Sequence, residues 1–215
     1  MPADDITAFF AKLAEADPAP RTELAYKNHF TLLVAVVLSA QATDIGVNRA
    51  TKDLFKKADN AKKMAALGET KIRDAVKTIG LYRNKAKNVF LLSQKLLTDH
   101  DGRVPATMEE LLALPGVGRK TANVVMNEAF GIATFAVDTH VFRLSNRSGL
   151  APGKDVLAVE KKLDKKVPEP YRMHAHHWLI LHGRYVCLAR KPKCHICQVY
   201  DYCHFKDKEK IKDMP

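Results

Sequence analysis

The chain has 215 residues, of which 47% are hydrophobic and 27% are charged. This length allows one large domain or two small ones and excludes a large multidomain assembly. The composition is that of a globular protein with a real core rather than of a disordered chain. The 35 lysine and arginine residues outnumber 24 acidic residues, which gives a formal net charge of +11. A polyanion is therefore the first partner to consider, and a basic protein without such a partner is the alternative.

The N-terminal segment and the hydropathy pattern indicate where the protein works. The chain begins Met-Pro-Ala-Asp-Asp-Ile, which is acidic and lacks the apolar core of an export signal. Its longest apolar run, Leu32 to Leu38, is too short to span a membrane. We therefore expect a soluble protein of a reducing, cytoplasmic compartment with no membrane partner.

Apolar residues recur at helical spacing through most of the chain, and no alternating run is long enough to predict a sheet. The predicted fold class is therefore all-α. Asp4 or Asp5 is expected to cap the first helix, and Asp44 is expected to cap the third. The segment from Phe30 to Ala40 is apolar on all sides, which favours a buried central helix. In chain order, the expected helices cover about residues 6–13, 30–40, 45–55, 84–97, 107–114, 119–130, 139–147, 155–165 and 171–181.

Residues 107–130 predict two helices joined by a tight turn. Thr107 and Glu110 have the spacing of a capping box at the start of the first, short helix. Pro115 ends that helix, and Gly131 closes the second one. The expected product is a helix-hairpin-helix.

The turn of this hairpin has the composition of a phosphate site. Gly116, Val117 and Gly118 precede the second helix, whose N-terminus carries the positive end of the helix dipole. Arg119 and Lys120 add formal charge at that end. Glycines before a helix N-terminus let backbone amides approach an anion, although an ordinary glycine turn without a ligand has the same pattern. A nucleotide-binding P-loop is excluded because its glycine spacing and its Gly-Lys pair are missing.

The four cysteines all lie in the C-terminal part of the chain, with the spacing Cys-x6-Cys-x2-Cys-x5-Cys. Four soft thiolates at this spacing can hold either a zinc ion or an iron-sulfur cluster. His195 and His204 lie within or beside this segment and keep the zinc alternative open. The cysteines are Cys187, Cys194, Cys197 and Cys203.

Five segments closely resemble the endonuclease III family of DNA glycosylases. They are Leu114-Pro-Gly-Val-Gly-Arg-Lys-Thr-Ala-Asn123, Ala136-Val-Asp-Thr-His140, Leu38-Ser-Ala-Gln-Ala-Thr-Asp44, Ile79-Gly-Leu-Tyr82 and His177-Trp-Leu-Ile-Leu-His-Gly-Arg184. The resemblance implies two helical domains flanking a DNA-binding cleft, one of about residues 22–132 and one of residues 1–21 plus 133–215. It also implies excision of oxidised pyrimidines from duplex DNA, followed by β-elimination that cleaves the strand 3′ to the abasic site.

The catalytic lysine and aspartate of this family correspond to Lys120 and Asp138. A neutral lysine amine can attack the sugar carbon that carries the damaged base and form a Schiff base. Asp138 is expected to stabilise positive charge that develops on the sugar. Considered without the resemblance, Lys120 could contact a phosphate and Asp138 could cap the helix that follows it.

The resemblance also assigns residues that contact DNA. Gln41 and Leu81 would fill the gap left in the base stack by a flipped nucleotide. Leu112 departs from relatives that carry an acidic residue there, which leaves the polar contacts at that position open. The phosphate contacts are expected from Gly116, Val117, Gly118 and Arg119. The possible lesion pocket comprises Ser39, Thr121 and His140.

The cysteine spacing resembles that of the family's [4Fe-4S] loop. The resemblance therefore implies a [4Fe-4S] cluster on the four cysteines and no further small-molecule cofactor. The expected partner is damaged double-stranded DNA, bound by a monomer that works at the bacterial nucleoid. One alternative is a non-catalytic DNA-binding module, and another is an adenine mismatch glycosylase, although such enzymes usually lack the lysine. A small iron-sulfur electron carrier is a third alternative, in which the long basic helical body has no evident purpose.

Overall fold

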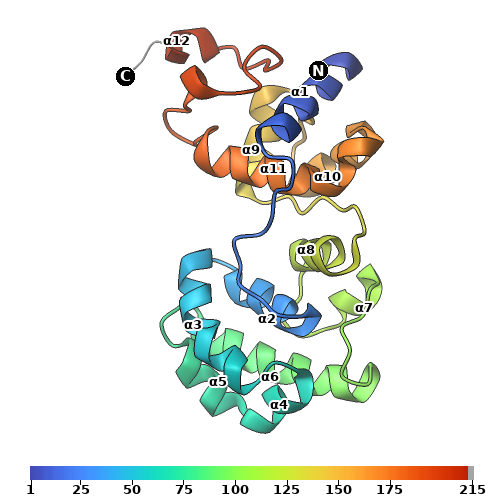
Figure 1. Cartoon of the computed structure of the whole chain (residues 1–215), viewed down its shortest axis with the longest axis vertical. Coiled ribbons are helices and arrows are strands. Elements are labelled where there is room, and N and C mark those ends of the chain that lie inside the picture. The colour runs from blue at the N-terminus through green and yellow to red at the C-terminus, as the bar shows by residue number, and fades with distance from the viewer. Residues whose placement is uncertain (213–215) are drawn as a thin grey trace. The chain divides into compact units, whose positions relative to one another are not determined.

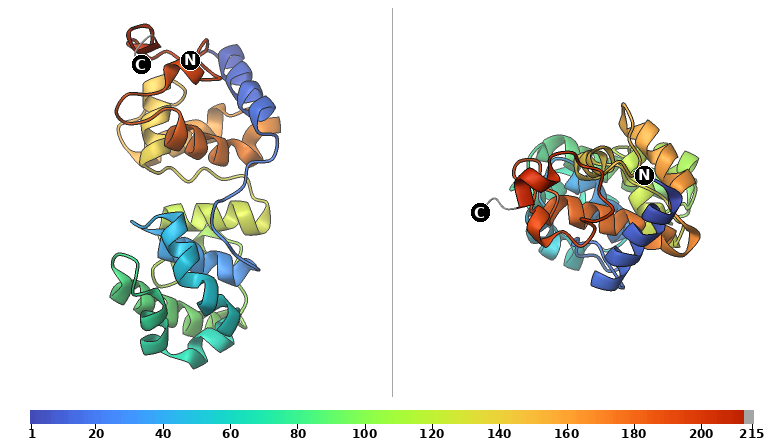
Figure 2. Two further views of the ribbon diagram at one scale, coloured as in Figure 1. Left: turned by 60° about the vertical axis from the view of Figure 1, so that its left-hand side comes forward. Right: turned by 90° about the horizontal axis from the view of Figure 1, so that it is seen from above.

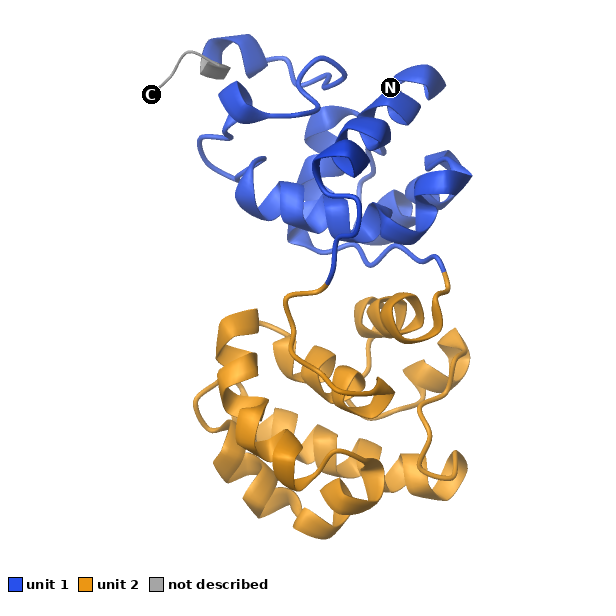
Figure 3. Cartoon of the chain, viewed as in Figure 1, with its two compact units in different colours: residues 1–21, 133–215 blue, residues 22–132 orange. Residues whose placement is uncertain are grey.

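The computed structural model describes residues 1–212, and that part of the chain consists of helices and loops without a strand (Figures 1 and 2). The predicted all-α class is thus confirmed. The chain divides into two compact units (Figure 3). Unit 1 comprises Met1–Arg21 and Ala133–Pro215, and unit 2 comprises Thr22–Ile132. None of the described helices combines the length and the apolar character needed to cross a bilayer.

Unit 2 is built around one apolar helix. Every residue of α2 from Phe30 to Leu38 is buried, and the helix contacts α3, α6 and α8. A helix that is apolar on all sides is stable in water only when neighbouring elements surround it, so the predicted central helix is confirmed. The helices of unit 2 are α2 (His29–Ser39), α3 (Asp44–Lys57), α4 (Ala61–Leu67), α5 (Glu69–Val76), α6 (Tyr82–Asp99), α7 (Met108–Leu112) and α8 (Arg119–Phe130).

Two short helices show the limits of the periodic pattern. The sequence pattern does not predict α4 and α5, which are only seven and eight residues long and bury few apolar side chains each. Gly68 separates them with a φ of 82°, a left-handed conformation that glycine adopts readily. The side chain of Asn60 starts α4 by accepting a hydrogen bond from the Lys63 N–H at 2.9 Å. Local caps and a glycine therefore define helices that are too short for a periodic signal.

The predicted caps of two helices are wrong by one to three residues. Pro2 occupies the N-cap of α1 (Ala3–Ala16), and Asp4 and Asp5 lie inside its first turn, where their charge favours the helix dipole. Thr43 rather than Asp44 caps α3, and its hydroxyl accepts from the Gly46 N–H at 3.2 Å. Threonine and aspartate are both favourable N-cap residues, so residue type alone does not distinguish Thr43 from Asp44 as the cap.

Unit 1 combines the N-terminal helix with the C-terminal part of the chain. Phe10 packs against Phe9, with ring centroids 5.5 Å apart, and against Trp178 at 6.4 Å. The Trp178 indole N–H donates to the Asp17 carbonyl at 2.8 Å, which fixes the end of α1 to α11. The remaining elements of unit 1 are α9 (Thr139–Ser148), α10 (Val156–Lys166), the 3-10 turn η1 (Glu169–Tyr171), α11 (Arg172–Tyr185), the 3-10 turn η2 (Cys194–Ile196) and α12 (Lys208–Lys212).

Two adjacent leucines of α6 test the packing of unit 2. Leu96 is fully buried, whereas Leu97 is 38% exposed. Leu96→Ala should lower the free energy of unfolding by about 2–5 kcal/mol, because it removes buried methyl groups and leaves a cavity. Leu97→Ala is the matched control and should cost much less. Urea unfolding followed by circular dichroism checks this, and equal losses for both variants would contradict the described core.

Candidate functional site

The short helix α7 begins the hairpin that the sequence predicts. The Thr107 hydroxyl accepts from the Glu110 N–H at 3.3 Å and donates to the Glu110 carboxylate at 2.5 Å. Glu110 thus reaches back to the hydroxyl of the cap residue, whereas a capping box would place it on the backbone N–H. The Val117 N–H donates to the Leu114 carbonyl at 3.1 Å and closes the turn. The two helices and the turn between them are therefore present as predicted.

Gly116 is required in this turn for two reasons. Its φ is 79°, and a Cβ built on it would lie 2.8 Å from the Cβ of Asn88 on α6. Any other residue would be strained and would also force α6 away. At the other end of the turn, Gly118 occupies the N-cap of α8, where no side chain forms a cap hydrogen bond. The start of α8 is thus open to an anion, and the positive end of its dipole lies there.

Lys120 is the second residue of α8 and is exposed. Thr121 follows it and is half-buried. Ser39 ends α2, which packs against α8, and its hydroxyl donates to the Val36 carbonyl at 2.8 Å. The buried face of α8 includes two polar residues, since Asn123 and Asn127 are buried beside Val124 and Val125, whereas Ala129 is only half-buried.

Gln41 and Leu81 share a rare backbone conformation. Their φ angles are 54° and 58°, in the left-handed region that residues other than glycine seldom adopt. A Cβ on Gly80 would lie 3.8 Å from the Gln41 carbonyl oxygen, so the two loops that carry these residues lie side by side. Gln41 is exposed, and Leu81 is 57% exposed. Residues that combine a strained backbone with an exposed side chain are typical of sites that bind a ligand.

One large apolar residue near these loops is exposed. Ile45 lies in the first turn of α3 but is 76% exposed, while Val47 is fully buried. The neighbouring Gly46 faces the loop of Leu81, since a Cβ on it would lie 3.9 Å from Ile79 Cγ2. The apolar side chain of Ile45 is therefore exposed at the start of α3, although Val47, two residues later, belongs to the core.

In unit 1, Asp138 is the N-cap of α9. Its Oδ1 atom accepts from the backbone N–H groups of His140 and Val141, both at 2.9 Å. The helix-cap role that the sequence left open is thus real, and it holds the carboxylate in one orientation. Phosphate or sugar groups that approach this helix end would meet a fixed carboxylate.

Sequence reasoning missed the arginine one turn further along α9. The Arg143 guanidinium donates through Nη2 to the Gly183 carbonyl at 2.5 Å and through Nε to the Cys187 carbonyl at 3.1 Å. Its Nη2 is also 3.2 Å from Nδ1 of His140. The contacts with Gly183 and Cys187 join residues 40 and 44 positions apart, and no sequence pattern indicates such pairs. Arg143 therefore ties α9 to the end of α11.

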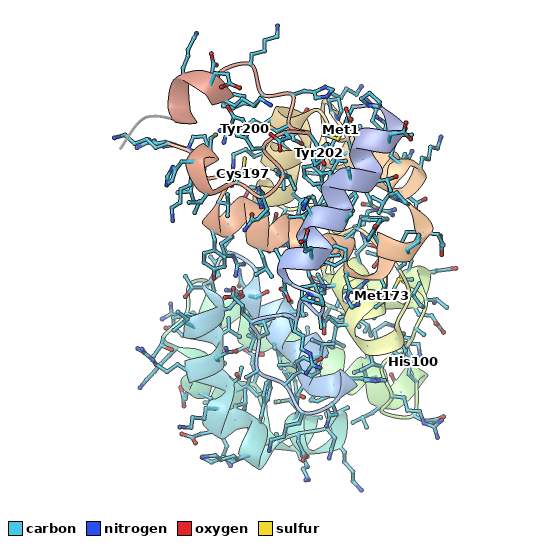
Figure 4. All side chains as sticks on the ribbon, turned by 45° about the horizontal axis from the view of Figure 1, so that its top comes forward. Met1, His100, Met173, Cys197, Tyr200 and Tyr202 are labelled. Carbon is cyan, nitrogen blue, oxygen red and sulfur yellow. The ribbon has the colours of Figure 1, made fainter. Side chains whose placement is uncertain are left out.

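All four cysteines line one pocket, with about 380 Å³ of empty volume. Apolar residues such as Leu144 and Val199 form much of the remaining wall, and Figure 4 shows Cys197 beside Tyr200 in this part of the chain. Within residues 1–212, no three His, Cys, Asp or Glu side chains converge closely enough to hold a single metal ion. The four thiols therefore line a common pocket and do not converge on one metal-ion position. His195 and His204 do not line this pocket.

Burial favours the protonated form of three of these thiols. It raises the pKa of Cys197 to about 12, and it also raises the pKa of Cys194 and of Cys203. Thiolates form in such surroundings when a metal group supplies positive charge. Sulfur donors in an apolar shell fit an iron-sulfur cluster, whose ligands are cysteine thiolates.

Comparison with known proteins gives consistent matches over most of the chain. The model of the HhH-GPD superfamily of base excision DNA repair proteins matches residues 34–169. The model of the iron-sulfur binding domain of endonuclease III matches residues 187–203. The first match covers more than half of the chain, and the second spans the four cysteines.

Individual relatives extend this similarity to nearly full length. Endonuclease III of Rickettsia felis is 53% identical over 205 residues, which cover 95% of this chain and 96% of the relative. Endonuclease III of Escherichia coli strain K12 is 52% identical over 200 residues, covering 93% and 95%. Two solved structures, a non-covalent endonuclease III–DNA complex and a trapped endonuclease III–DNA covalent intermediate, each superpose with a TM-score of 0.89 at 42% identity over 98% of both chains.

The hairpin, the cysteine pocket and these matches agree. The protein is an enzyme that binds DNA, a DNA glycosylase and abasic-site lyase with a [4Fe-4S] cluster, which excludes the non-catalytic module and the electron carrier as alternatives. The chain belongs to the endonuclease III family of base excision DNA repair enzymes.

Proposed function

We propose that this enzyme excises oxidised pyrimidines from damaged duplex DNA and cleaves the strand through a Schiff base on Lys120. The observation that carries the proposal is an exposed lysine in the first turn of α8, directly after the glycine turn of the hairpin. A hairpin that binds the DNA backbone would bring this amine to the sugar of a nearby nucleotide. We further propose that the two units are functional domains, of which unit 2 contains Lys120 and unit 1 contains Asp138.

The proposed chemistry begins when the neutral amine of Lys120 bonds to the sugar C1′. The glycosidic bond breaks, and the base departs with its electron pair and takes up a proton. The amine then loses a proton while the C1′–O4′ bond of the sugar ring breaks and O4′ takes up a proton, which leaves a Schiff base between Nζ and C1′. Loss of a C2′ proton then breaks the C3′–O3′ bond, and the 3′ phosphate departs with the bonding electrons. The lysine thus serves both base removal and strand cleavage.

Asp138 supports these steps through its fixed charge. The two hydrogen bonds from the start of α9 orient its carboxylate before the substrate arrives. A preoriented negative charge stabilises the positive charge of the breaking sugar bond without further rearrangement. It also offers a site for proton transfer. The helix-cap role and the catalytic role therefore act together.

Residues of unit 2 would hold and open the duplex. Gly116, Val117, Gly118 and Arg119 would bind a phosphate at the start of α8. Gln41 and Leu81 would replace the flipped nucleotide in the stack, because opening a duplex costs a few kcal/mol that inserted side chains can offset. Ser39 and Thr121 are the lesion-contacting residues proposed in this unit, and His140 is the one proposed in unit 1.

The cysteine pocket completes the proposal. Cys187, Cys194, Cys197 and Cys203 would be the cluster ligands, since all four line the same pocket. When bound, the cluster holds together a loop-rich segment that contains little regular structure. The enzyme would act as a monomer in the bacterial cytoplasm, where its DNA substrate lies, and its named relatives are bacterial.

Lys120→Ala tests the proposed nucleophile. The variant should form no adduct when borohydride is added to an abasic duplex, because no other amine occupies this position. Lys62→Ala changes an exposed lysine of α4 and serves as the control, with trapping like the wild type. The wild type should also release base from a thymine-glycol duplex but not from an adenine mismatch. Persistent trapping in Lys120→Ala would refute the assignment, and preferred adenine release would favour the mismatch glycosylase.

Two substitutions of Asp138 separate its structural and chemical roles. Asp138→Asn keeps an oxygen that can accept the cap hydrogen bonds but removes the charge, so stability should stay close to that of the wild type. Asp138→Ala should lose about 0.5–2 kcal/mol of stability through the missing cap. Base release should fall about 100-fold or more in both variants, because the electrostatic stabilisation is lost. Full activity in Asp138→Asn would limit this residue to capping.

Leu81→Ala tests the filling of the base stack. Release of a damaged base from a duplex should fall about tenfold or more, because the cost of an unfilled gap is no longer offset. Strand cleavage at a preformed abasic site should fall less, since no base remains to be displaced. Leu157→Ala, at a 40% exposed leucine of α10, is the control. Equal losses in both reactions would argue against a role in base displacement.

A further inference from the structure

Arg147, in the last turn of α9, contacts one of the proposed ligand sulfurs directly. Its Nη1 lies 3.5 Å from Cys187 Sγ and donates to the Leu188 carbonyl at 2.6 Å. Its Nη2 donates to the Ala189 carbonyl at 3.0 Å. One guanidinium thus binds the first cysteine and the two residues that follow it.

The same end of α9 also holds the far end of the cysteine segment. The Arg147 guanidinium lies over the ring of Phe205, 5.1 Å from its centroid, two residues after Cys203. The His204 N–H donates to the Ser148 carbonyl at 3.0 Å. Gly149 has a φ of 78°, and a Cβ there would lie only 3.2 Å from the His204 Cβ. Both ends of the segment from Cys187 to Cys203 therefore pack on the C-terminal turn of α9.

Other cations near this pocket are placed differently. The Lys208 amine also lines the pocket, but it donates to the Tyr200 carbonyl at 2.8 Å and lies over the Tyr200 ring. Arg190 and Lys191 are exposed on the loop that follows Cys187, where a DNA phosphate could reach them. Arg147 is half-buried, and its guanidinium donates hydrogen bonds to Cys187 Sγ and to two backbone carbonyls of the same chain. These contacts stabilise the conformation of the loop, whereas a phosphate-binding arginine would direct its guanidinium toward solvent.

We propose that Arg147 is a positioning residue that fixes Cys187 and the start of the basic loop to α9, so that retention of the cluster depends on it. This inference rests on the proposed set of cysteine ligands. Groups that hydrogen-bond to metal ligands orient them, and their loss typically weakens metal binding about 10–100-fold. A planar guanidinium can hold several acceptors at once, whereas the single ammonium of lysine cannot reproduce this arrangement.

The test measures iron release from the anaerobically purified holoenzyme without DNA. The wild type, Arg147→Gln, Arg147→Lys and the control Arg190→Gln are mixed with an iron chelator, and the visible absorbance of the cluster is followed. Both Arg147 variants should release iron about tenfold faster or more. Arg190→Gln removes a cation of the loop but leaves the hydrogen bonds of Arg147 in place, so this variant should release iron at the wild-type rate. Far-UV circular dichroism before mixing verifies that the helices are intact.

The oxidation potential of the cluster is a second readout, which reports the hydrogen bond from Arg147 to the ligand sulfur. N–H groups directed at a cluster sulfur stabilise its more reduced, more negative state. One-electron oxidation at an electrode should therefore occur at a lower potential in Arg147→Gln than in the wild type. Arg147→Lys is the milder variant and decides the outcome if Arg147→Gln retains too little cluster.

Two results would overturn the inference. One is wild-type iron release in Arg147→Lys and Arg147→Gln, and the other is fast release in Arg190→Gln as well, which would make loop charge the cause. Borohydride trapping by the wild-type enzyme is measured in parallel. Failure of trapping would refute Lys120 as the nucleophile and would leave the iron-release result intact, so the two proposals fail separately.

Discussion

The start of a helix is the structural feature on which the proposed site depends. Backbone N–H groups in the first turn have no partner within the helix, and the dipole is positive there. Gly118 and Lys120 lie at the start of α8, Asp138 caps α9, and Leu81 occupies the N-cap of α6. In an all-helical protein, such ends are the places where the backbone itself can bind or orient a charged group. The proposed chemistry therefore gathers at helix termini rather than along helix faces.

These helix ends are useful only because their helices are held firmly. In unit 2, α2 supplies an apolar centre against which α8 packs, and Asn88 of α6 fits closely against Gly116. In unit 1, α9 packs against α11, while α1 contributes two phenylalanines to the same core. A substitution far from the DNA can thus displace a catalytic group by shifting the helix that carries it.

The sequence predicted the elements that depend on local chemistry. The glycine turn, the buried apolar helix and the cap position of Asp138 follow from residue types and spacing, and the structure contains all three. It did not predict the exposure of Ile45, because helical spacing shows which residues share a face but not where the neighbouring core ends. It also missed Arg143 and Arg147, whose partners lie about 40 residues away. Contacts of that kind depend on the tertiary fold, which a single sequence does not display.

The assignments of the catalytic and cluster residues came from the resemblance, because the residues alone allowed simpler roles. Asp138 illustrates why this ambiguity arises. A carboxylate at an N-cap is common in helical proteins, and nothing in the local sequence distinguishes a structural cap from one that also faces a substrate. The structure adds the two hydrogen bonds that hold this carboxylate at the start of α9.

The left-handed backbone at Gln41 and Leu81 limits which sequences can serve at these two loops. Side chains branched at Cβ are disfavoured in this conformation, so valine, isoleucine and threonine would be penalised whatever their fit to DNA. Mutational drift at these positions is thereby confined mainly to unbranched side chains and glycine. A change in how the enzyme fills the base stack would therefore have to come from the length or polarity of these side chains, because the left-handed backbone disfavours residues branched at Cβ.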